Sequence, residues 1–167
     1  MARLFAQHDK TSLRYEALSE EPVSALTRPG HPLQRVANLG LRDIVGAAWI
    51  VPPAGSVLRH RFELMFQEAG LQAPVNVVET SALLFLTKML QQSDMIGVMA
   101  SDVARYYVAH GIGAMLPIAL PCKMDAFGII TRTDRPLSPA GTVMLDAIKA
   151  AATTVYGTRF DSTAAPR

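Results

Sequence analysis

The stretch VNVVETSALLFLTKMLQQSDMIGVMA, residues 75–100, decides the fold of this chain. It contains a short β-branched run, a polar break, an almost wholly apolar run at 82–90, a second polar break and a second apolar run at 95–99. This order predicts a strand, a buried helix and another strand. Two strands joined by one helix form a βαβ unit, which is the building block of a parallel sheet.

Thr80 and Ser81 lie where this helix is expected to begin. The free backbone N–H groups and the positive dipole end of a helix N-terminus attract an anion or a polar ligand. Two interpretations of the hydroxyls stay open: one of them caps the helix, as serine and threonine do in proteins of every kind, or they donate hydrogen bonds to a ligand. A cap leaves other N–H groups free, so the two roles are compatible.

Composition limits the classes of protein to which the chain can belong. Its 167 residues, 50% apolar and 18% charged, suffice for one domain or two small lobes with a buried core. A net charge of +2 from scattered basic residues gives no footprint for nucleic acid. Cys122 is the only cysteine, which excludes an intrachain disulfide and a multi-cysteine metal site. We recognise neither a signal peptide nor an apolar run of membrane-spanning length, and we predict a cytoplasmic protein without membrane contact.

Turn and cap residues divide the rest of the chain into further predicted elements. A serine, an amphipathic run and a glycine predict a helix from Ser56 to Gly70. A serine followed by proline predicts the start of another helix at Ser138, which reaches about Tyr156. The remaining predictions are strands at 13–18, 23–27, 49–51, 114–120 and 127–131, a turn at 19–22, a helix from Asn38 to Val45, and a helix that is capped by Ser101 or Asp102 and reaches Ala109.

The loops that follow the predicted strands are the candidate ligand sites. Strands alternate with helices between residues 49 and 120, which favours an open α/β sheet. In such sheets ligands bind at the carboxyl ends of the strands. The loop at 52–56, with Pro53 and Ser56, and the loop at 79–81 both follow a strand and precede a helix. For the first loop a tight strand-to-helix turn is the alternative, because it lacks the second glycine and the lysine of a phosphate-binding loop.

Ala100, Ser101 and Phe127 are further candidates for contact with a ligand. Structural alternatives stand beside them, since Ser101 is also expected to cap a helix and Phe127, an aromatic residue in a strand, to belong to the core.

Other chemistry-bearing residues give no site. The sequence contains no motif for a nucleophile, a paired carboxylate or a dinucleotide, so it predicts no catalytic residue and no cofactor. The histidines have no metal-ligand spacing, so we predict no metal site and expect all of them to be solvated. They are His8, His31, His60 and His110.

Four segments together resemble the effector-binding domain of LysR-type transcriptional regulators. Their order and spacing carry the resemblance, which extends over residues 13–150. The segments are TRPGHPL (27–33), WIVPPAGSVLRHRFELMFQEAGL (49–71), VVETSALLFLTKMLQQSDMIGVMAS (77–101) and GIITRTDRPLSPAGTVMLDAIKA (128–150).

The resemblance implies a fold like that of a type II periplasmic binding protein, with two α/β lobes, two crossover strands and a small-molecule cleft at the hinge. On this template residues 1–45 are the end of lobe I and the first crossover, and residues 46–118 are lobe II. Residues 119–157 return to lobe I as a crossover, a strand and a helix, and residues 158–167 are a tail. We therefore predict an α/β fold with a complete lobe II and a partial lobe I.

The family's winged helix-turn-helix and the first half of its lobe I have no counterpart in the sequence. DNA binding is therefore not transferred to these residues, and effector binding is transferred only for the lobe II wall. The resemblance implies a small-molecule-sensing and dimerisation module. Its expected partners are a carboxylate, an aromatic acid or a sugar-like compound as effector, and further copies of itself in a homo-oligomer, expected to be a dimer.

Two other functions stay open. An interaction protein without a functional effector site would self-associate, or pair with a full-length regulator, through apolar surface left uncovered on the strand at Phe127 and on the helix after Ser138. A small α/β enzyme would require a nucleophile or an acid–base pair at the strand ends, and fold class alone does not imply one.

Overall fold

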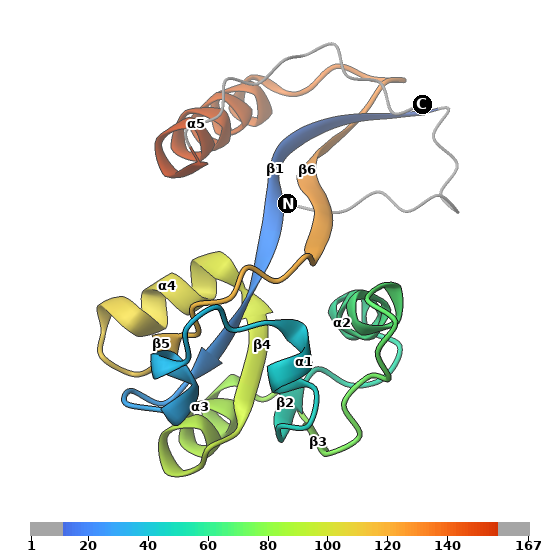
Figure 1. The fold of residues 1–167 in the computed structure, drawn as a ribbon. Coiled ribbons are helices and arrows are strands. Elements are labelled where there is room, and N and C mark those ends of the chain that lie inside the picture. The colour runs from blue at the N-terminus through green and yellow to red at the C-terminus, as the bar shows by residue number, and fades with distance from the viewer. Residues whose placement is uncertain (1–11, 157–167) are drawn as a thin grey trace. The chain divides into compact units, whose positions relative to one another are not determined.

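The computed structural model of the protein describes residues 12–156, which form two compact units (Figure 1). Residues 21–124 form the larger unit, and residues 12–20 together with 125–156 form the described part of the smaller one. The lobe boundaries implied by the resemblance stay predictions.

Three parallel strands form the centre of the sheet in the larger unit. β2 (Trp49–Val51) lies between β3 (Val77–Glu79) and β4 (Ile96–Ala100). β1 (Leu13–Thr27) runs antiparallel to β4, and β5 (Ala114–Met115) runs antiparallel to β1, which gives the order β3-β2-β4-β1-β5. The predicted open α/β sheet is confirmed, but β3 and β4 are not neighbours, because β2 separates them.

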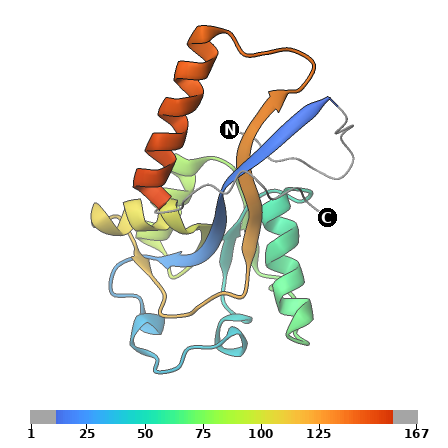
Figure 2. The same ribbon diagram turned by 90° about the horizontal axis from the view of Figure 1, so that it is seen from above.

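Helices cover both faces of this sheet. α2 (Val57–Glu68) packs on one face, whereas α3 (Leu83–Gln92) and α4 (Ser101–Ala109) pack on the other (Figure 2). The alternation of side chains along β2 explains this arrangement, because Trp49 and Val51 belong to the α2 core and the residue between them belongs to the core of α3 and α4. β2 is therefore the centre of both cores.

An aromatic cluster holds α2 on the sheet. The ring of Trp49 lies 4.8 Å from that of Phe62 and 6.2 Å from that of Phe66, edge to face in both pairs. Trp49 Nε1 donates to the carbonyl oxygen of Ile44 at 3.0 Å, so the one polar group of the indole is satisfied inside the core. The same bond fixes the end of α1 (Leu41–Ile44) against that core.

A two-stranded ribbon is the basis of the smaller unit. β6 (Lys123–Arg132) pairs with β1, and at the end of the ribbon the Thr133 N–H donates to the carbonyl oxygen of Ser12 at 2.9 Å. The Tyr15 hydroxyl donates to the carbonyl oxygen of Ala126 at 2.6 Å, which adds a side-chain link between the two strands.

The helix of the smaller unit is α5 (Pro139–Tyr156), and it begins where the sequence predicts. The Ser138 hydroxyl oxygen accepts the N–H of Gly141 at 3.1 Å, as an N-cap should. Ala152 is its one fully buried side chain. Its exposed large apolar side chains are Val143, Met144 and Val155. The expectation of uncovered apolar surface on this helix is therefore confirmed. No helix within residues 12–156 is long and apolar enough to cross a membrane.

β1 corrects the prediction of two short strands. Residues 13–27 form one continuous strand, and the expected turn at 19–22 does not occur. Pro22 lies inside the strand, where proline is tolerated if its missing N–H would not have faced a partner. Pairing continues directly after it, because the Val23 N–H donates to the carbonyl oxygen of Cys122 at 3.3 Å.

The helix predicted from Asn38 to Val45 is present but shorter, and Asn38 does not cap it. The chain forms a short 3₁₀ helix, η1 (Pro32–Arg35), and then the single-turn α1. Gly40 is the N-cap of α1, and its N–H donates to the carboxylate of Asp43 at 2.8 Å. Asn38 has a φ of 55°, the left-handed conformation that asparagine tolerates better than most residues, so it ends the preceding turn and caps nothing.

Two strands differ in length from their predictions. β5 covers only Ala114–Met115 within the predicted 114–120, and Pro117 explains the early end because proline has no N–H for the ladder. β6 begins at Lys123 rather than at Phe127, because its partner β1 is uninterrupted and continues to offer backbone groups for pairing.

α3 corrects the expectation of a buried helix. Only Leu86 and Leu90 are fully buried, whereas Leu83, Leu84 and Phe85 are 55%, 76% and 49% exposed. A helix that is apolar all round is buried only if neighbours cover it on every side. Here α3 packs on one face of a sheet whose outermost strand is β3, so its other side stays open to solvent.

Gly128 provides a test of the ribbon. A Cβ at this position would lie 2.2 Å from the carbonyl oxygen of Glu16 in β1, so the two strands would have to separate. We expect Gly128→Ala to lower the free energy of unfolding by at least about 2 kcal/mol, since overpacking of this kind forces backbone shifts. Urea unfolding followed by circular dichroism measures the change. The matched control is Gly46→Ala, whose Cβ meets nothing within 4 Å and which should change stability by less than about 0.5 kcal/mol.

Candidate functional site

The carboxyl ends of β2, β3 and β4 form one edge of the larger unit, because the three strands are parallel. α2, α3 and α4 all begin at this edge, each directly after the strand that precedes it in the chain. All predicted site residues except Phe127 lie where these strands pass into helices, in the connection itself or at the end of one of the two elements. The edge therefore combines three helix N-termini with the hydroxyl groups that the sequence singled out.

Thr80 and Ser81 precede α3, but neither of them caps it. The N-cap is Ala82, which has no side-chain hydrogen bond to give. The Thr80 N–H donates to the carbonyl oxygen of Val51, and Thr80 Oγ1 accepts the N–H of Ala82, both at 3.0 Å. Ser81 is exposed, and its hydroxyl bonds to no group among residues 12–156. The turn is thus fixed to the end of β2. Within residues 12–156, the Ser81 hydroxyl and the first N–H groups of α3 donate to no acceptor.

The loop at 52–56 behaves as the tight strand-to-helix turn that the sequence left open. Ser56 is the N-cap of α2, and its hydroxyl oxygen accepts the N–H of Arg59 at 3.3 Å. Gly55 has a φ of +83°, which the turn requires and which glycine adopts without strain. Pro53 is exposed beside it. A side chain of the protein itself therefore already accepts a hydrogen bond from the first turn of α2.

An ion-pair network that the sequence did not reveal holds this loop against β3. Arg59, whose side chain is only 12% exposed, donates to Glu79 at 2.9 Å and to Glu63 at 2.5 Å. The second carboxylate oxygen of Glu79 accepts the N–H of Ala54 at 3.4 Å. The spacing of Arg59 and Glu63 along one helix is a visible signal. The contact with Glu79, which is 20 residues away, appears only once β2 and β3 pair.

Ser101 is buried, and it does not cap α4. The N-cap is Ala100, and α4 has no side-chain cap, so the prediction of a cap at Ser101 or Asp102 is wrong. The Ser101 hydroxyl lies 2.6 Å from the hydroxyl of Ser24, which is also buried. The reason is the pairing of β1 with β4, which brings Ser24 of the antiparallel strand beside the first turn of α4. The two hydroxyls satisfy one another, and the first amides of α4 have no side-chain acceptor.

Phe127 lies in the other unit, in β6. Its half-buried ring packs edge to face against Tyr156, with the ring centroids 5.5 Å apart. This contact agrees with the alternative that Phe127 serves packing.

His31 corrects the expectation that all histidines are solvated. It is buried, its Nδ1 accepts the N–H of Leu33 at 3.1 Å, and its Nε2 lies 3.1 Å from the carbonyl oxygen of Asp94. The acceptor role of Nδ1 places the hydrogen on Nε2. His60 and His110 are exposed as expected, and His8 lies outside the described residues.

Two further checks concern cysteine and metal chemistry. Burial raises the pKa of the Cys122 thiol, which keeps it protonated and unreactive. Within residues 12–156 no three histidine, cysteine or acidic residues lie close enough together to hold a metal ion.

An apolar groove lies between α3 and α4 on the solvent side. Its volume is about 700 Å³. Tyr107, at its base, shares a hydrogen bond of 2.7 Å with Thr87 through their hydroxyls. The side chains that line the groove are Leu83, Leu84, Thr87, Asp102, Val103, Tyr106, Tyr107 and Ile112. Sequence reasoning missed this groove because it expected α3 to be buried.

Comparison with known proteins gives a consistent result. Residues 1–153 match the model of the LysR substrate binding domain family. The chain is 32% identical over 155 residues to the HTH-type transcriptional regulator GbpR of Azospirillum brasilense, and 36% identical over 143 residues to the HTH-type transcriptional regulator GalR of Pseudomonas putida. These alignments cover 92% and 85% of the chain but 45% and 36% of the relatives, so the chain spans less than half the length of either.

Solved structures share the fold. The regulatory domain of CcmR from Synechocystis, in complex with 2-PG, superposes with a TM-score of 0.71 at 18% identity. The superposition covers 90% of this chain and 73% of the CcmR chain. The effector binding domain of QuiR, in complex with shikimate, superposes with a TM-score of 0.66 at 16% identity. The superposition covers 90% of this chain and 70% of the QuiR chain. At such identities the likeness concerns the fold, and it confirms the predicted α/β fold of the type II periplasmic-binding-protein kind.

The contact between Arg59 and Glu79 can be measured by a double-mutant cycle. We expect Arg59→Met and Glu79→Gln, alone and combined, to give a coupling free energy of about 0.5–1 kcal/mol in urea unfolding, because both carboxylate partners are partly exposed. Arg42→Met combined with Glu79→Gln is the control, because Arg42 is exposed and pairs with no described carboxylate. A coupling no larger than in that control would contradict the assignment.

Proposed function

Since this chain belongs to the LysR substrate-binding domain family, we propose that it is the small-molecule-sensing part of a transcription regulator, and that its larger unit binds the effector at the edge where α3 and α4 begin. DNA binding and the choice of target genes belong to the whole regulator and are not assigned to these residues. That the chain is cytoplasmic and not an enzyme stays a prediction.

One observation carries the proposal: α3 and α4 both start without a side-chain cap, and they start on the same face of the sheet. Uncapped first turns present backbone N–H groups and the positive ends of two helix dipoles, and the one carboxylate in the first turn of α4, Asp102, is paired with Arg105. The exposed Ser81 hydroxyl and the Thr80 hydroxyl lie beside the first of these turns. The arrangement favours a ligand that carries negative charge and accepts hydrogen bonds.

The start of α2 is proposed to form a wall of this site rather than to bind the charge of the ligand. Ser56 caps it, and the Glu79 carboxylate accepts an amide of the preceding loop. An anion would meet like charge from Glu79 there, so we assign Pro53 and Ser56 to shaping the wall rather than to holding charge. Ala100 and Ser101 contribute backbone amides at the start of α4. Contact of Phe127 with the effector stays a prediction.

We assign the effector to the small hydroxylated carboxylates. Amides and dipole ends suit the carboxylate, and the hydroxyls of Thr80 and Ser81 suit ligand hydroxyl groups. The complex of the QuiR domain with shikimate is one instance of a compound of this class in a related fold. Shikimate is therefore the first probe, and its methyl ester is the control that lacks the charge.

A charge-insertion variant separates ligand binding from stability. Ser81→Asp places a carboxylate beside the N-terminus of α3, where it should leave the thermal midpoint unchanged or raise it, because negative charge is favourable at that end of a helix. The same charge should weaken shikimate binding at least tenfold in isothermal titration calorimetry, about 1.4 kcal/mol. Gln72→Asp adds equal charge on an exposed loop of the same unit and should not change the affinity. Equal affinities of the two variants, or equal binding of the methyl ester, would refute the site.

Self-association is the second part of the proposal. The groove between α3 and α4 exposes several neighbouring apolar side chains. Monomeric proteins rarely expose large contiguous apolar patches to solvent. Symmetric dimers are the commonest assembly of soluble proteins. We therefore assign this groove to contact between copies of the chain.

Leu84 is the residue with which to test that contact. It is 76% exposed, so Leu84→Asp should leave the folded unit intact and should convert a dimer to a monomer in sedimentation velocity at micromolar concentration. Val75→Asp is the control, since Val75 is 82% exposed and does not line the groove. A native chain that stays monomeric, or a control that dissociates equally, would contradict the assignment.

A further inference from the structure

We propose that the hydroxyl groups of Ser24 and Ser101 act as one unit at the effector edge. Ser24 positions the Ser101 hydroxyl, and the Ser101 hydroxyl donates a hydrogen bond to the carboxylate of the effector. The inference rests on the proposed function, because it concerns the same edge of the larger unit. It gives a role to Ser24, a residue of β1 that the sequence does not predict for the site.

The two side chains meet inside the larger unit. Ser24 is 7% exposed and Ser101 is 5% exposed, and their hydroxyl oxygens lie 2.6 Å apart. The antiparallel pairing of β1 with β4 brings them together, since it places Val23 opposite Ala100, the residue directly before Ser101. The first residue of α4 is therefore held by a side chain from a neighbouring strand of the sheet.

The number of hydrogen atoms in this pair exceeds the number of acceptors. Two hydroxyl groups carry two hydrogens, and the bond between them uses one. Neither hydroxyl bonds to any other group among residues 12–156. A buried donor without an acceptor is unfavourable, so a ligand that supplies an acceptor gains binding energy at this position.

Ser101 is the member of the pair that can meet the ligand. It begins α4, which has no side-chain cap, whereas Ser24 lies in a strand between β4 and β5. The Ser24 hydroxyl then donates to Ser101 Oγ, and Ser101 donates onward. A hydroxyl that accepts one hydrogen bond is polarised into a better donor, and a carboxylate is a stronger acceptor than a neutral group. The positive end of the α4 dipole favours the same anion.

A binding cycle on the full chain tests the inference. In isothermal titration calorimetry with shikimate, Ser101→Ala should weaken binding about tenfold, because a charge-assisted hydrogen bond is lost. Ser24→Ala should weaken it about threefold, because the Ser101 hydroxyl loses its orientation. In the Ser101→Ala background, Ser24→Ala should have no further effect on the affinity. A purely structural role of the pair would instead give two losses that add.

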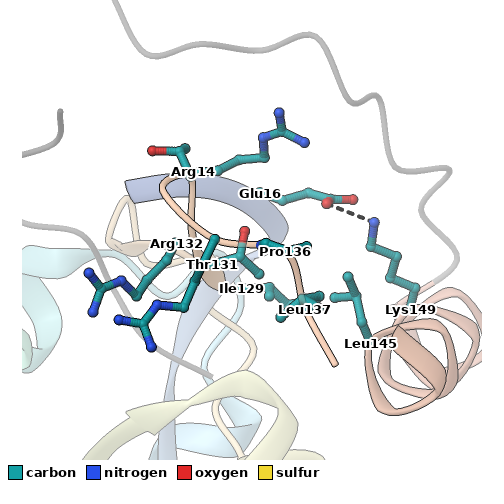
Figure 3. Close-up of a pocket in the computed structure, with 11 residues that line it drawn as sticks. Arg14, Glu16, Ile129, Thr131, Arg132, Pro136, Leu137, Leu145 and Lys149 are labelled. Atoms are coloured by element: carbon teal, nitrogen blue, oxygen red, sulfur yellow. Dashed lines mark ion pairs between the residues drawn. The ribbon is translucent and has the colours of Figure 1, made fainter. Parts of the chain in front are cut away.

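Two control variants remove other contacts of β1. Thr27→Val deletes a buried hydroxyl of the same strand, which donates to the carbonyl oxygen of Ala114 at 3.2 Å. Lys149→Met breaks the ion pair of 2.7 Å with Glu16 in the smaller unit, which the dashed line in Figure 3 marks. Both are expected to lower the thermal midpoint in circular dichroism, and both should bind shikimate as the native chain does.

The outcomes separate this inference from the proposed function. If shikimate binds and Ser101→Ala binds it equally well, or if the controls weaken binding as much as Ser24→Ala does, the inference is wrong and the proposed effector class stands. If shikimate does not bind, the effector class is wrong, and acetate decides the inference. Acetate should shift the backbone amide resonances of residues 101–104 in NMR titrations of the native chain and not of Ser101→Ala. Absence of that shift from the native chain would overturn the inference.

Discussion

The pairing of β2 with a parallel neighbour on each side is the constraint on which the larger unit depends. Trp49 and Ile50 are fully buried, and Val51 is nearly so, because one faces α3 and the other two face α2. A strand of three residues can serve two cores only if all its backbone groups are used and its side chains alternate between the faces. The same pairing brings three strand ends into line, which is why three helices begin at one edge.

The three helices that start at that edge differ in how their first turns are satisfied. Ser56 caps the start of α2, and the half-buried Arg59 connects that start to β3 through Glu79. The starts of α3 and α4 lack side-chain caps. For the effector site proposed above, these amides are already positioned by folding, so little ordering would be required when a ligand arrives.

The sequence predicts the local parts of this structure well. Ser56 and Ser138 cap helices as their surroundings indicate, and the order strand, helix, strand within residues 75–100 is confirmed. What it cannot predict depends on contacts between distant residues. The Ser24–Ser101 hydroxyl pair joins residues 77 positions apart, and the bond of His31 to Asp94 spans 63. The exposure of α3 is of the same kind, because it depends on where the other elements within residues 12–156 pack, and a local sequence pattern carries no information about that.

The position of β1 has a consequence for folding. It is the first strand among residues 12–156, yet in the sheet it lies between β4 and β5, the last two strands of the larger unit to be synthesised. Its apolar residues Val23, Ala25 and Leu26, all buried in the finished sheet, must wait for both partners. Closure over so long a loop is slow, and an unpaired apolar strand is prone to aggregate meanwhile. Until residue 115 has been synthesised, β1 therefore lacks its partner β5, and its apolar side chains are without the cover that the finished sheet gives them.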